Sequence, residues 1–542
     1  MSKPVVPSLL SESSAHNRGR TVGIVSILTV VVACFGYFRE AALAAHFGLS
    51  TTMDAYFAAI FVPTIFYMIL IAGTLSPIFI PILLSTENGG SPQKLTETFS
   101  VVTTFVLLFL IVIVSGAMLT APSWLAVLFP GFSASTAAMS TRLIYIIFPS
   151  VLFVALAGIL TALLNGFHKF ALASFAPALS SLAVIVAVLL AHGENAIYLV
   201  GMATAAGFLL QFLFLIPAAA KLGFRYTPSL NFSHSAIRKL LRLGGPLLLY
   251  LVIANGSAFV ERNLASQLSV GAVSTLTYAM RLFTIPSNFL AAPLGIVVYP
   301  QFAREALREG RGNLAAQVSR IFRAILFIFV PITLWTIINA LPITRLLFER
   351  GQFKLENSIV TAQVLRLYGI GILPLAMGGI LLRCFYAVED TVTALYAEIV
   401  DLIFYVIVAT FFTRRFGIQG LALTRGISFY LVTGILVVVL WNRKHLLHFD
   451  LDMVRFIALT TVASLAMVAI NWISWHFFYL AFDRGGIAAR ISVVASLGLI
   501  TGGTFIGVAR LFRVKEATHV MTTLVQMVTG VSGSIPHRNG VV

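Results

Sequence analysis

The sequence predicts an all-α protein that crosses a membrane many times. Of its 542 residues, 59% are hydrophobic and only 10% are charged, a balance that water-soluble domains of this length do not have. Apolar runs of roughly twenty residues, the length at which a helix crosses the hydrocarbon core, recur along the chain. Because they recur so often, the first run is expected to be a membrane span and not a cleaved signal peptide.

About 14 such spans can be placed, and their even number puts both termini on one side of the membrane. The windows lie near residues 21–47, 54–84, 97–119, 138–164, 172–192, 196–219, 238–268, 271–300, 317–348, 359–386, 391–413, 417–441, 453–478 and 486–512. A polar N-terminal tail, residues 1–20, ends in HNRGR before the first window, and a tail of residues 514–542 follows the last. We expect both tails to be cytoplasmic.

The distribution of basic residues supports this orientation. Loops after even-numbered windows carry Lys94, His168, Lys169, Lys221, Arg225, Arg238, Lys239, Arg242, Arg304, Arg308, Arg311, Arg443 and Lys444. Lys and Arg are enriched in cytoplasmic loops, so this topology also accounts for the net charge of +17, and no nucleic-acid partner is expected. The exceptions on the predicted outer side are Arg345, Arg350, Lys354, Arg414 and Arg415.

An internal repeat appears when the chain is laid over itself at an offset of about 221 to 223 residues. Pro63 then falls on Pro286, Pro77 falls on Pro300, and AGIL at 157–160 falls on GGIL at 378–381. A shared offset indicates duplication, whereas single prolines would be ordinary helix kinks. We expect a six-helix N-lobe (21–225), a six-helix C-lobe (226–445) and two appended helices (446–513). Repeats of this kind enclose a substrate site and rock around it.

The stretch from residue 36 to 81 contains the first candidate site. It places Arg39, Glu40 and Asp54 among apolar residues and interrupts the run repeatedly with Gly and Pro. An ionisable side chain at bilayer depth costs a few kcal/mol unless it faces a bundle interior or a wet cavity, and broken helices at that depth line cavities. These residues therefore predict a substrate or ion pathway. The alternative is that they lie in a short loop between two spans.

The repeat supplies a counterpart, with Glu261, Arg262 and Arg281 in the second lobe. Facing each other across a cleft, Arg39 and Arg281 would bind an anion, and a pyrophosphate suits the guanidinium fork. Alternatively, each arginine pairs with its own neighbouring carboxylate and only locks a helix end. Glu261, inside an apolar window, is the candidate for ion coupling, either by binding a proton or by holding a small cation. A plain ion pair with an arginine across the bundle is the competing interpretation.

Several kinds of chemistry are absent from the sequence. It contains no Walker A pattern, no HExxH, no GxSxG and no His, Cys or Asp cluster with metal spacing. Cys34 and Cys384 lie in separate apolar runs, so neither a disulfide nor a metal site is expected. We expect no cofactor and no enzymatic activity, because a membrane-embedded transferase would need carboxylates or histidines grouped near a membrane face. An ion gradient, the membrane potential or the substrate's own gradient must supply the energy.

Several segments between about residues 21 and 445 carry a pattern that extends beyond hydropathy. They are FREAALAAHFGLSTTMDAYFAA, FPSVLFVALAGILTALLNGFHKFALASFAPAL, YAMRLFTIPSNFLAAPLGIVVYPQFARE, LFERGQF and FYAVEDTVTAL. In order and spacing, these segments resemble the MurJ/MviN family of lipid II flippases. The resemblance implies two six-helix lobes that work by alternating access, as in the wider multidrug/oligosaccharidyl-lipid/polysaccharide exporter superfamily. It matches Arg39, Asp54 and Arg281 to family positions at the central cavity, and the appended helices to a groove for the lipid tail.

The chain also departs from the family pattern. Tyr67 and Met68 stand where the family often has a basic pair, and Ala33 replaces a further arginine, so the chain is a divergent member. The expected function is to flip a polyprenyl-pyrophosphate-linked saccharide, lipid II or a related lipid-linked oligosaccharide, across the bacterial inner membrane for peptidoglycan synthesis and cell shape. The alternative is an ion-coupled exporter of drugs or other small molecules.

The expected binding set follows from the candidate sites and the resemblance. Substrate-binding residues are Arg39, Glu40, Asp54 and Arg281, and Glu261 is the ion-coupling residue for sodium or a proton. We expect a monomer.

Overall fold

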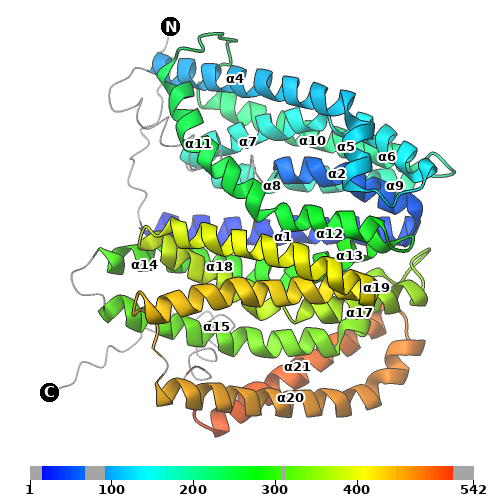
Figure 1. The fold of residues 1–542 in the computed structure, drawn as a ribbon, viewed down its shortest axis with the longest axis vertical. Coiled ribbons are helices and arrows are strands. Elements are labelled where there is room, and N and C mark those ends of the chain that lie inside the picture. The colour runs from blue at the N-terminus through cyan, green and yellow to red at the C-terminus, as the bar shows by residue number, and fades with distance from the viewer. Residues whose placement is uncertain are drawn as a thin grey trace. The chain divides into compact units, whose positions relative to one another are not determined.

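The computed structural model describes residues 15–67, 92–167, 169–307, 312–448, 450–514 and 516, and these residues form helices and connecting turns without a strand (Figure 1). The all-α fold is thereby confirmed. The first half of the chain contains α1 (Ala15–Phe47), α2 (Thr51–Tyr67), α4 (Pro92–Leu119), α5 (Ala121–Leu128), α6 (Ala134–Ile147), α7 (Ser150–Gly166), α8 (Phe170–Phe175), α9 (Pro177–Leu190) and α10 (Ala196–Lys221).

The second half repeats this order and adds two long helices. It contains α11 (Ser235–Ala254), α12 (Gly256–Ser266), α13 (Ala272–Pro286), the π-helix η2 (Ser287–Ala291), α14 (Ala292–Ala306), α15 (Gly312–Ile338), α16 (Ala340–Phe348), α17 (Leu355–Gly369), α18 (Ile372–Ala387) and α19 (Thr391–Asn442). The appended helices are α20 (Leu451–Arg484) and α21 (Ile487–Leu511).

The duplication is visible in the order and spacing of these helices. Helices α6 and α7 form a bent pair with an angle of 41°, and α17 and α18 form another with an angle of 43°. The second pair begins about 221 residues after the first, and α13 begins at the same offset from α2. In the first pair the bend lies at Pro149, which lacks the N–H that would continue the helix. The bent helix pair therefore recurs at the same offset as the repeat detected in the sequence.

The helices long and apolar enough to span a membrane number nine among the described residues, or eleven with each bent pair counted as one span. The predicted number of fourteen spans differs from this count because of three predicted windows or pairs of windows. Helix α19 joins two predicted windows across a kink at Gly417, and the window 238–268 is divided at Asn255 between α11 and α12. The window 54–84 includes residues outside the described ranges.

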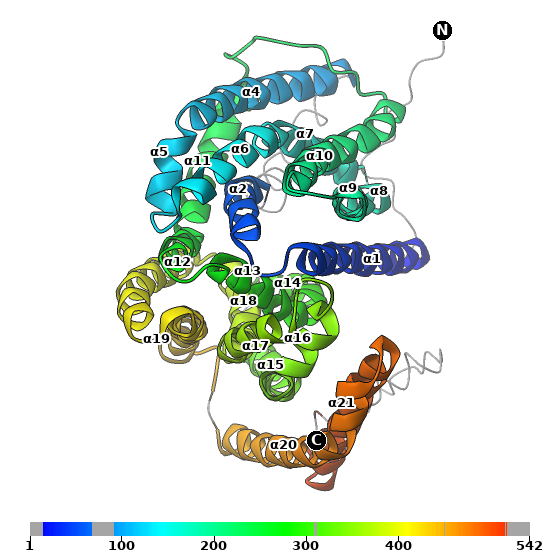
Figure 2. The ribbon, with the colours of Figure 1, turned by 90° about the vertical axis from the view of Figure 1, so that its right-hand side faces the viewer.

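The chain divides into two compact units. The first comprises residues 1–279, 347–361 and 402–421. In it, α10 packs against α7 and α9, α1 against α8 and α9, and α2 against α6 and α7 (Figure 2). The second comprises residues 280–346, 362–401 and 422–542, and in it α18 packs against α14 and α15, and α20 against α15 and α21. The lobe boundaries predicted from the sequence remain a prediction.

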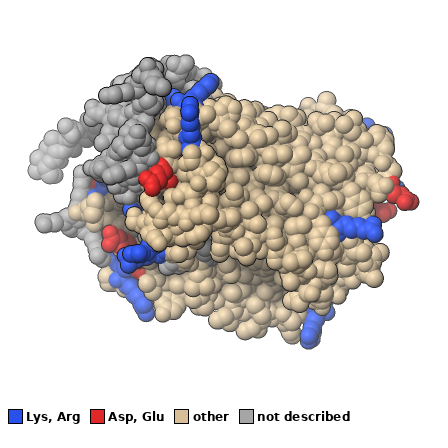
Figure 3. Space-filling model, turned by 90° about the horizontal axis from the view of Figure 1, so that it is seen from above, with Lys and Arg blue, Asp and Glu red and all other residues tan. Residues whose placement is uncertain are grey.

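The surface is suited to lipid. On the face drawn in Figure 3, charged side chains gather toward the two ends and leave a band of uncharged residues between them. Large apolar side chains are widely exposed, among them Leu119 at 84%, Trp472 at 75% and Leu499 at 78%. Exposed apolar surface of this extent marks an interaction with membrane or protein, and the apolar helices make the chain a multi-pass membrane protein.

The start of α19 is held by an ion pair that should respond to pH. Asp390 accepts a hydrogen bond from the N–H of Thr393 at 3.1 Å, and its other carboxylate oxygen lies 2.9 Å from Lys444 Nζ. Burial alone would raise the pKa of Asp390, but the hydrogen bonds from Lys444 and Thr393 outweigh it and lower that pKa below its ordinary value. A carboxyl with a lowered pKa stabilises the fold above its unfolded-state pKa and loses that contribution as pH falls through the folded value.

We therefore expect Asp390→Asn to lower the melting temperature at pH 7 and to have little effect near pH 3, below roughly the unfolded-state pKa of an aspartate. Melting of the two proteins in detergent across this range tests the expectation. A difference that is equally large at both pH values would show that the Asp390 charge does not act through this pair. Asp452→Asn, an exposed carboxylate in the first turn of α20, is the control.

Candidate functional site

Arg39 and Glu40 form an ion pair within α1. Arg39 Nη2 lies 2.7 Å from Glu40 Oε1, and the two side chains are 19% and 3% exposed. Glu40 is therefore buried, whereas the Arg39 side chain is partly exposed. The structure brings together two of the predicted site residues, in the pairing that the sequence left open as an alternative.

Asp54, at the start of α2, joins that helix to α13. One carboxylate oxygen accepts the Gly271 N–H at 2.7 Å, and the other accepts the Ser274 N–H at 2.8 Å. The first N–H groups of a helix have no partner within the helix, and the positive end of the helix dipole favours a carboxylate there. Asp54 is only 5% exposed, so it acts as a buried cap for a helix more than two hundred residues away.

Glu261 and Arg262 have separate environments although they are adjacent in α12. Arg262 Nη1 donates hydrogen bonds to Thr277 Oγ1 at 2.9 Å and to the Val273 carbonyl at 3.2 Å, both in α13. Its guanidinium lies 5.6 Å from the ring centroid of Phe61 in α2, within cation–π range. Glu261 is buried, with 3% exposure. Arg262 thus reinforces the same junction of α2 and α13 that Asp54 closes.

Two glycine loops complete this junction, and they occupy corresponding positions in the repeat. A Cβ at Gly131 would lie 2.2 Å from the Ser266 carbonyl oxygen at the end of α12, and a Cβ at Gly351 would lie 2.2 Å from the Ala45 carbonyl oxygen near the end of α1. Gly351 also has a φ of +57°, which favours glycine. Each repeat therefore places a glycine loop against the first-helix segment of the other repeat.

Arg281 belongs to the part of α13 that the second unit contains, whereas Arg39 belongs to the first unit. Arg281 is partly exposed and lies five residues before Pro286, where α13 passes into the π-helix η2. Turns of π-helix occur frequently at functional sites. The common cavity for Arg39 and Arg281 stays a prediction. Of the residues that depart from the family pattern, Tyr67 ends α2, and Met68 lies outside the described residues.

A buried charged cluster in α19 was missed by the sequence analysis. Glu398 and Asp401 lie on the first half of the helix, and Arg425 on the second half interacts electrostatically with both. Ser428 donates a hydrogen bond to Asp401. Asp401 is 7% exposed and Arg425 is 6% exposed. The signal was present, because two carboxylates three residues apart and one arginine interrupt neighbouring apolar windows.

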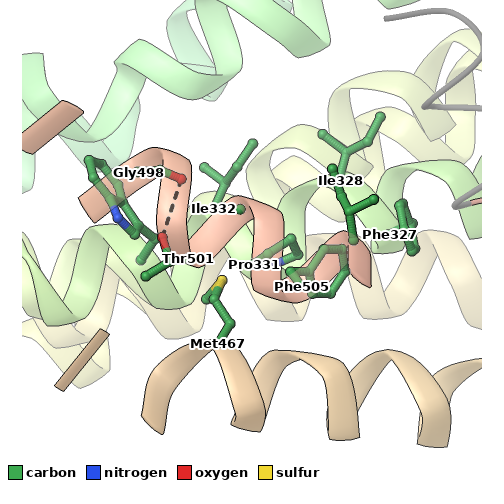
Figure 4. Close-up of a pocket in the computed structure, with 11 residues that line it drawn as sticks. Phe327, Ile328, Pro331, Ile332, Met467, Gly498, Thr501 and Phe505 are labelled. Atoms are coloured by element: carbon green, nitrogen blue, oxygen red, sulfur yellow. Dashed lines mark hydrogen bonds between the residues drawn. The ribbon is translucent and has the colours of Figure 1, made fainter. Parts of the chain in front are cut away.

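The second unit contains an apolar groove between α15, α20 and α21, with a cavity of about 310 Å³ (Figure 4). Phe327, Pro331 and Ile332 of α15 form one wall, and Met467 of α20 and Phe505 of α21 face them. The one hydroxyl in the lining, that of Thr501, is turned back to the carbonyl of Leu497 at 2.5 Å. The groove therefore offers hydrocarbon surface and is suited to an apolar chain.

No group of three or more His, Cys, Asp or Glu side chains within the described ranges is placed to hold a metal ion.

Known proteins resemble the chain along most of its length. The family model described as "Lipid II flippase MurJ" matches residues 43–490. The lipid II flippase MurJ of Burkholderia cenocepacia is 26% identical over 518 residues, which cover 92% of this chain and 98% of that protein. A probable lipid II flippase MurJ of Rhizobium meliloti is 29% identical over 378 residues, covering 66% of this chain and 68% of that protein.

Solved structures show the same fold. The structure of a lipid II flippase MurJ in an inward closed conformation has a TM-score of 0.75 at 23% identity, over 90% of this chain and 99% of that one. An inward-facing multidrug transporter of the MATE family has a TM-score of 0.60 at 15% identity, over 78% of this chain and 98% of that one. Because the family model matches well over half of its length, the chain belongs to the MurJ family of lipid II flippases.

Proposed function

We propose that this protein moves lipid II, the polyprenyl-pyrophosphate-linked precursor of peptidoglycan, across the bacterial inner membrane without catalysing a reaction on it. The observation that carries the proposal is membership of the MurJ family over residues 43–490. An ion-coupled exporter of drugs is the second candidate, favoured only by the more distant fold resemblance to a MATE transporter, with a TM-score of 0.60 against 0.75 for the MurJ structure.

Arg39, Glu40, Asp54 and Arg281 are the proposed substrate-binding residues. The support for Arg39 is that its side chain is 19% exposed and that Glu40 Oε1 lies 2.7 Å from its Nη2. An oriented guanidinium can donate two parallel hydrogen bonds to a pyrophosphate. Arg281 is also partly exposed and stands next to a change in helix type. In this scheme Asp54 positions the N-terminus of α13, which precedes Arg281 along the same helix.

The contacts of Asp54, Arg262, Gly131 and Gly351 are proposed to form the outer gate of the transporter. They join the two repeats at the ends where α1 turns into α2 and α12 turns into α13. The Lys and Arg distribution favours the outer side for these turns and the cytoplasm for both termini. Alternating access would require the gate contacts to break. The groove between α15, α20 and α21 is the proposed position of the polyprenyl tail.

The proposal is tested by expressing the protein in a bacterium whose own lipid II flippase is depleted. We expect growth to be restored, and lipid II not to accumulate in the inner leaflet. Failure to grow at a normal membrane level would contradict lipid II as the substrate. Depletion in the native host would then identify which other undecaprenyl-linked saccharide accumulates, and Tyr67 and Met68 would be the residues to examine first.

Glu261 is proposed to couple transport to an ion. The support is its burial in α12, where a charge is costly unless it is compensated. We expect Glu261→Gln to remove the dependence of transport on an imposed proton or sodium gradient in vesicles. Glu356→Gln, which changes an exposed carboxylate in the first turn of α17, is the control. A gradient dependence unchanged in Glu261→Gln would leave Glu261 with a purely structural role.

A further inference from the structure

A second groove lies within the first unit between α1 and α9, beside the contact of Gly351 with Ala45. Its volume is about 390 Å³. On α1 it is lined by the small side chains of Ala41, Ala42 and Ala45 and by the ring of Phe38, and Ile185 of α9 faces them. One charged side chain, Arg350, completes the lining. The groove therefore combines hydrocarbon walls with a single cation.

Arg350 is held in place by the loop that carries it. The Gln352 N–H donates a hydrogen bond to the Ala45 carbonyl at 2.7 Å, and Gly351 permits a backbone approach that a Cβ would prevent. Phe353 is fully buried and packs edge-on against Tyr278, with ring centroids 5.7 Å apart. The backbone N–H of Phe353 also bonds to the Arg350 carbonyl at 3.0 Å. The cation is thus anchored to the last turn of α1.

The positions of the lining residues along α1 match the depth profile of a lipid. Ala45 lies two residues before the end of the helix, and the end of a membrane-spanning helix is expected at headgroup level. Phe38 lies seven residues earlier, which at the rise of an α-helix is about 10 Å deeper, at the level of acyl chains. Phe38 is 66% exposed, so a neighbouring molecule can reach it. On this basis we expect Arg350 at phosphate level, with the apolar walls at the level of the acyl chains.

We propose that this groove binds an anionic glycerophospholipid of the surrounding membrane, with its phosphate on the Arg350 guanidinium and one acyl chain between α1 and α9. Guanidinium and phosphate form strong charge-assisted hydrogen bonds. Arg350 Nη2 already donates a hydrogen bond to the Leu347 carbonyl at 3.2 Å, and a guanidinium has five N–H donors, so others can reach a phosphate. The proposal also gives a function to Arg350, one of the few basic residues on the predicted outer side of the membrane.

Native mass spectrometry of the full-length protein in detergent tests the proposal, with phosphatidylglycerol and phosphatidylcholine as probes. The parent is expected to retain phosphatidylglycerol preferentially. Arg350→Gln should lower its affinity by about tenfold or more, the value of a hydrogen bond to a charged group. Lys354→Gln removes a nearby exposed cation that does not line the groove and should behave like the parent. Equal retention by parent and Arg350→Gln would overturn the proposal.

A second variant tests the apolar part of the groove while leaving Arg350 in place. Ala42→Leu places a larger side chain in the groove and should weaken retention of phosphatidylglycerol. The melting temperature of the unliganded variant shows whether it is folded. Unchanged retention in a folded Ala42→Leu variant would place the lipid elsewhere. A competition with undecaprenyl phosphate separates the two lipid sources. If it displaces phosphatidylglycerol at a lower concentration in the parent but not in Arg350→Gln, the occupant is polyprenyl lipid and our assignment is wrong.

Discussion

Replacing either Arg39 or Arg281 with alanine is expected to abolish lipid II transport while the protein still reaches the membrane. Each change removes a bidentate donor that we propose binds the pyrophosphate. Lysine at either position should restore transport only in part, because an ammonium group lacks the planar fork. Complementation of a flippase-depleted strain, with membrane levels measured by immunoblot, distinguishes loss of transport from loss of protein.

The two arginines need different controls. Arg39→Ala leaves Glu40 buried without its 2.7 Å partner, and breaking a buried ion pair in this way costs about 3–5 kcal/mol. The double variant Arg39→Ala/Glu40→Gln removes that charge, so it should be as abundant in the membrane as the parent and should still fail to transport. Arg443→Ala, at an exposed position after α19, should retain full activity. Normal growth with Arg281→Ala would rule out a role for Arg281 in substrate binding. A structure in which either guanidinium faces lipid would rule out a cavity shared by Arg39 and Arg281.

Arg425→Leu is expected to produce the largest loss of stability. Arg425 is 6% exposed and is the cation that faces both Glu398 and Asp401. Its removal leaves the buried Asp401 and the partly buried Glu398 without this counter-charge, and breaking a buried ion pair costs about 3–5 kcal/mol. Cys384, which is fully buried, reports unfolding by its reaction with a thiol reagent on heating, provided that the exposed Cys34 is first replaced by alanine.

Two further variants show whether the loss comes from charge. Arg425→Leu/Asp401→Asn removes one carboxylate charge and should melt at a higher temperature than Arg425→Leu alone. Arg414→Leu changes an exposed arginine in the same helix and should melt like the parent. Unfolding of Arg425→Leu at the parental temperature would mean that the cluster does not stabilise the protein.

The fold class follows from the sequence because a bilayer restricts the possible structures. No water is available in the hydrocarbon core to satisfy the backbone, so an apolar run of about twenty residues must be helical there. The duplication could be read for a similar reason, since helix lengths and bends repeat with the proline and glycine positions that cause them. The number of spans was harder to predict because Gly417 and Asn255 change how consecutive helices are divided.

The sequence was sufficient to name charged residues of the candidate site, but not to identify the groups that they contact. Arg39 and Glu40 are neighbours in sequence, so their pairing was one of two interpretations open from the start. Asp54 was recognised as a buried charge, but its partners are the N–H groups of Gly271 and Ser274. Backbone donors carry no signature in the sequence, and the identity of the helix that Asp54 caps depends on packing.

For the basic residues on the predicted outer side too, the sequence gives the residue type and only the structure gives its partners. Their charge is read directly from the sequence, and their place on the outer side of the membrane stays a prediction. Their environments are not local. Arg345 pairs with Asp483 at 2.9 Å and lies over the ring of Phe482, whereas Arg350, five residues later, lines the groove between α1 and α9. The chain's composition and periodicity determine that it is helical, duplicated and membrane-spanning, because these are properties of each segment and its solvent. Only the tertiary structure decides which charge meets which partner, because that depends on contacts between segments hundreds of residues apart.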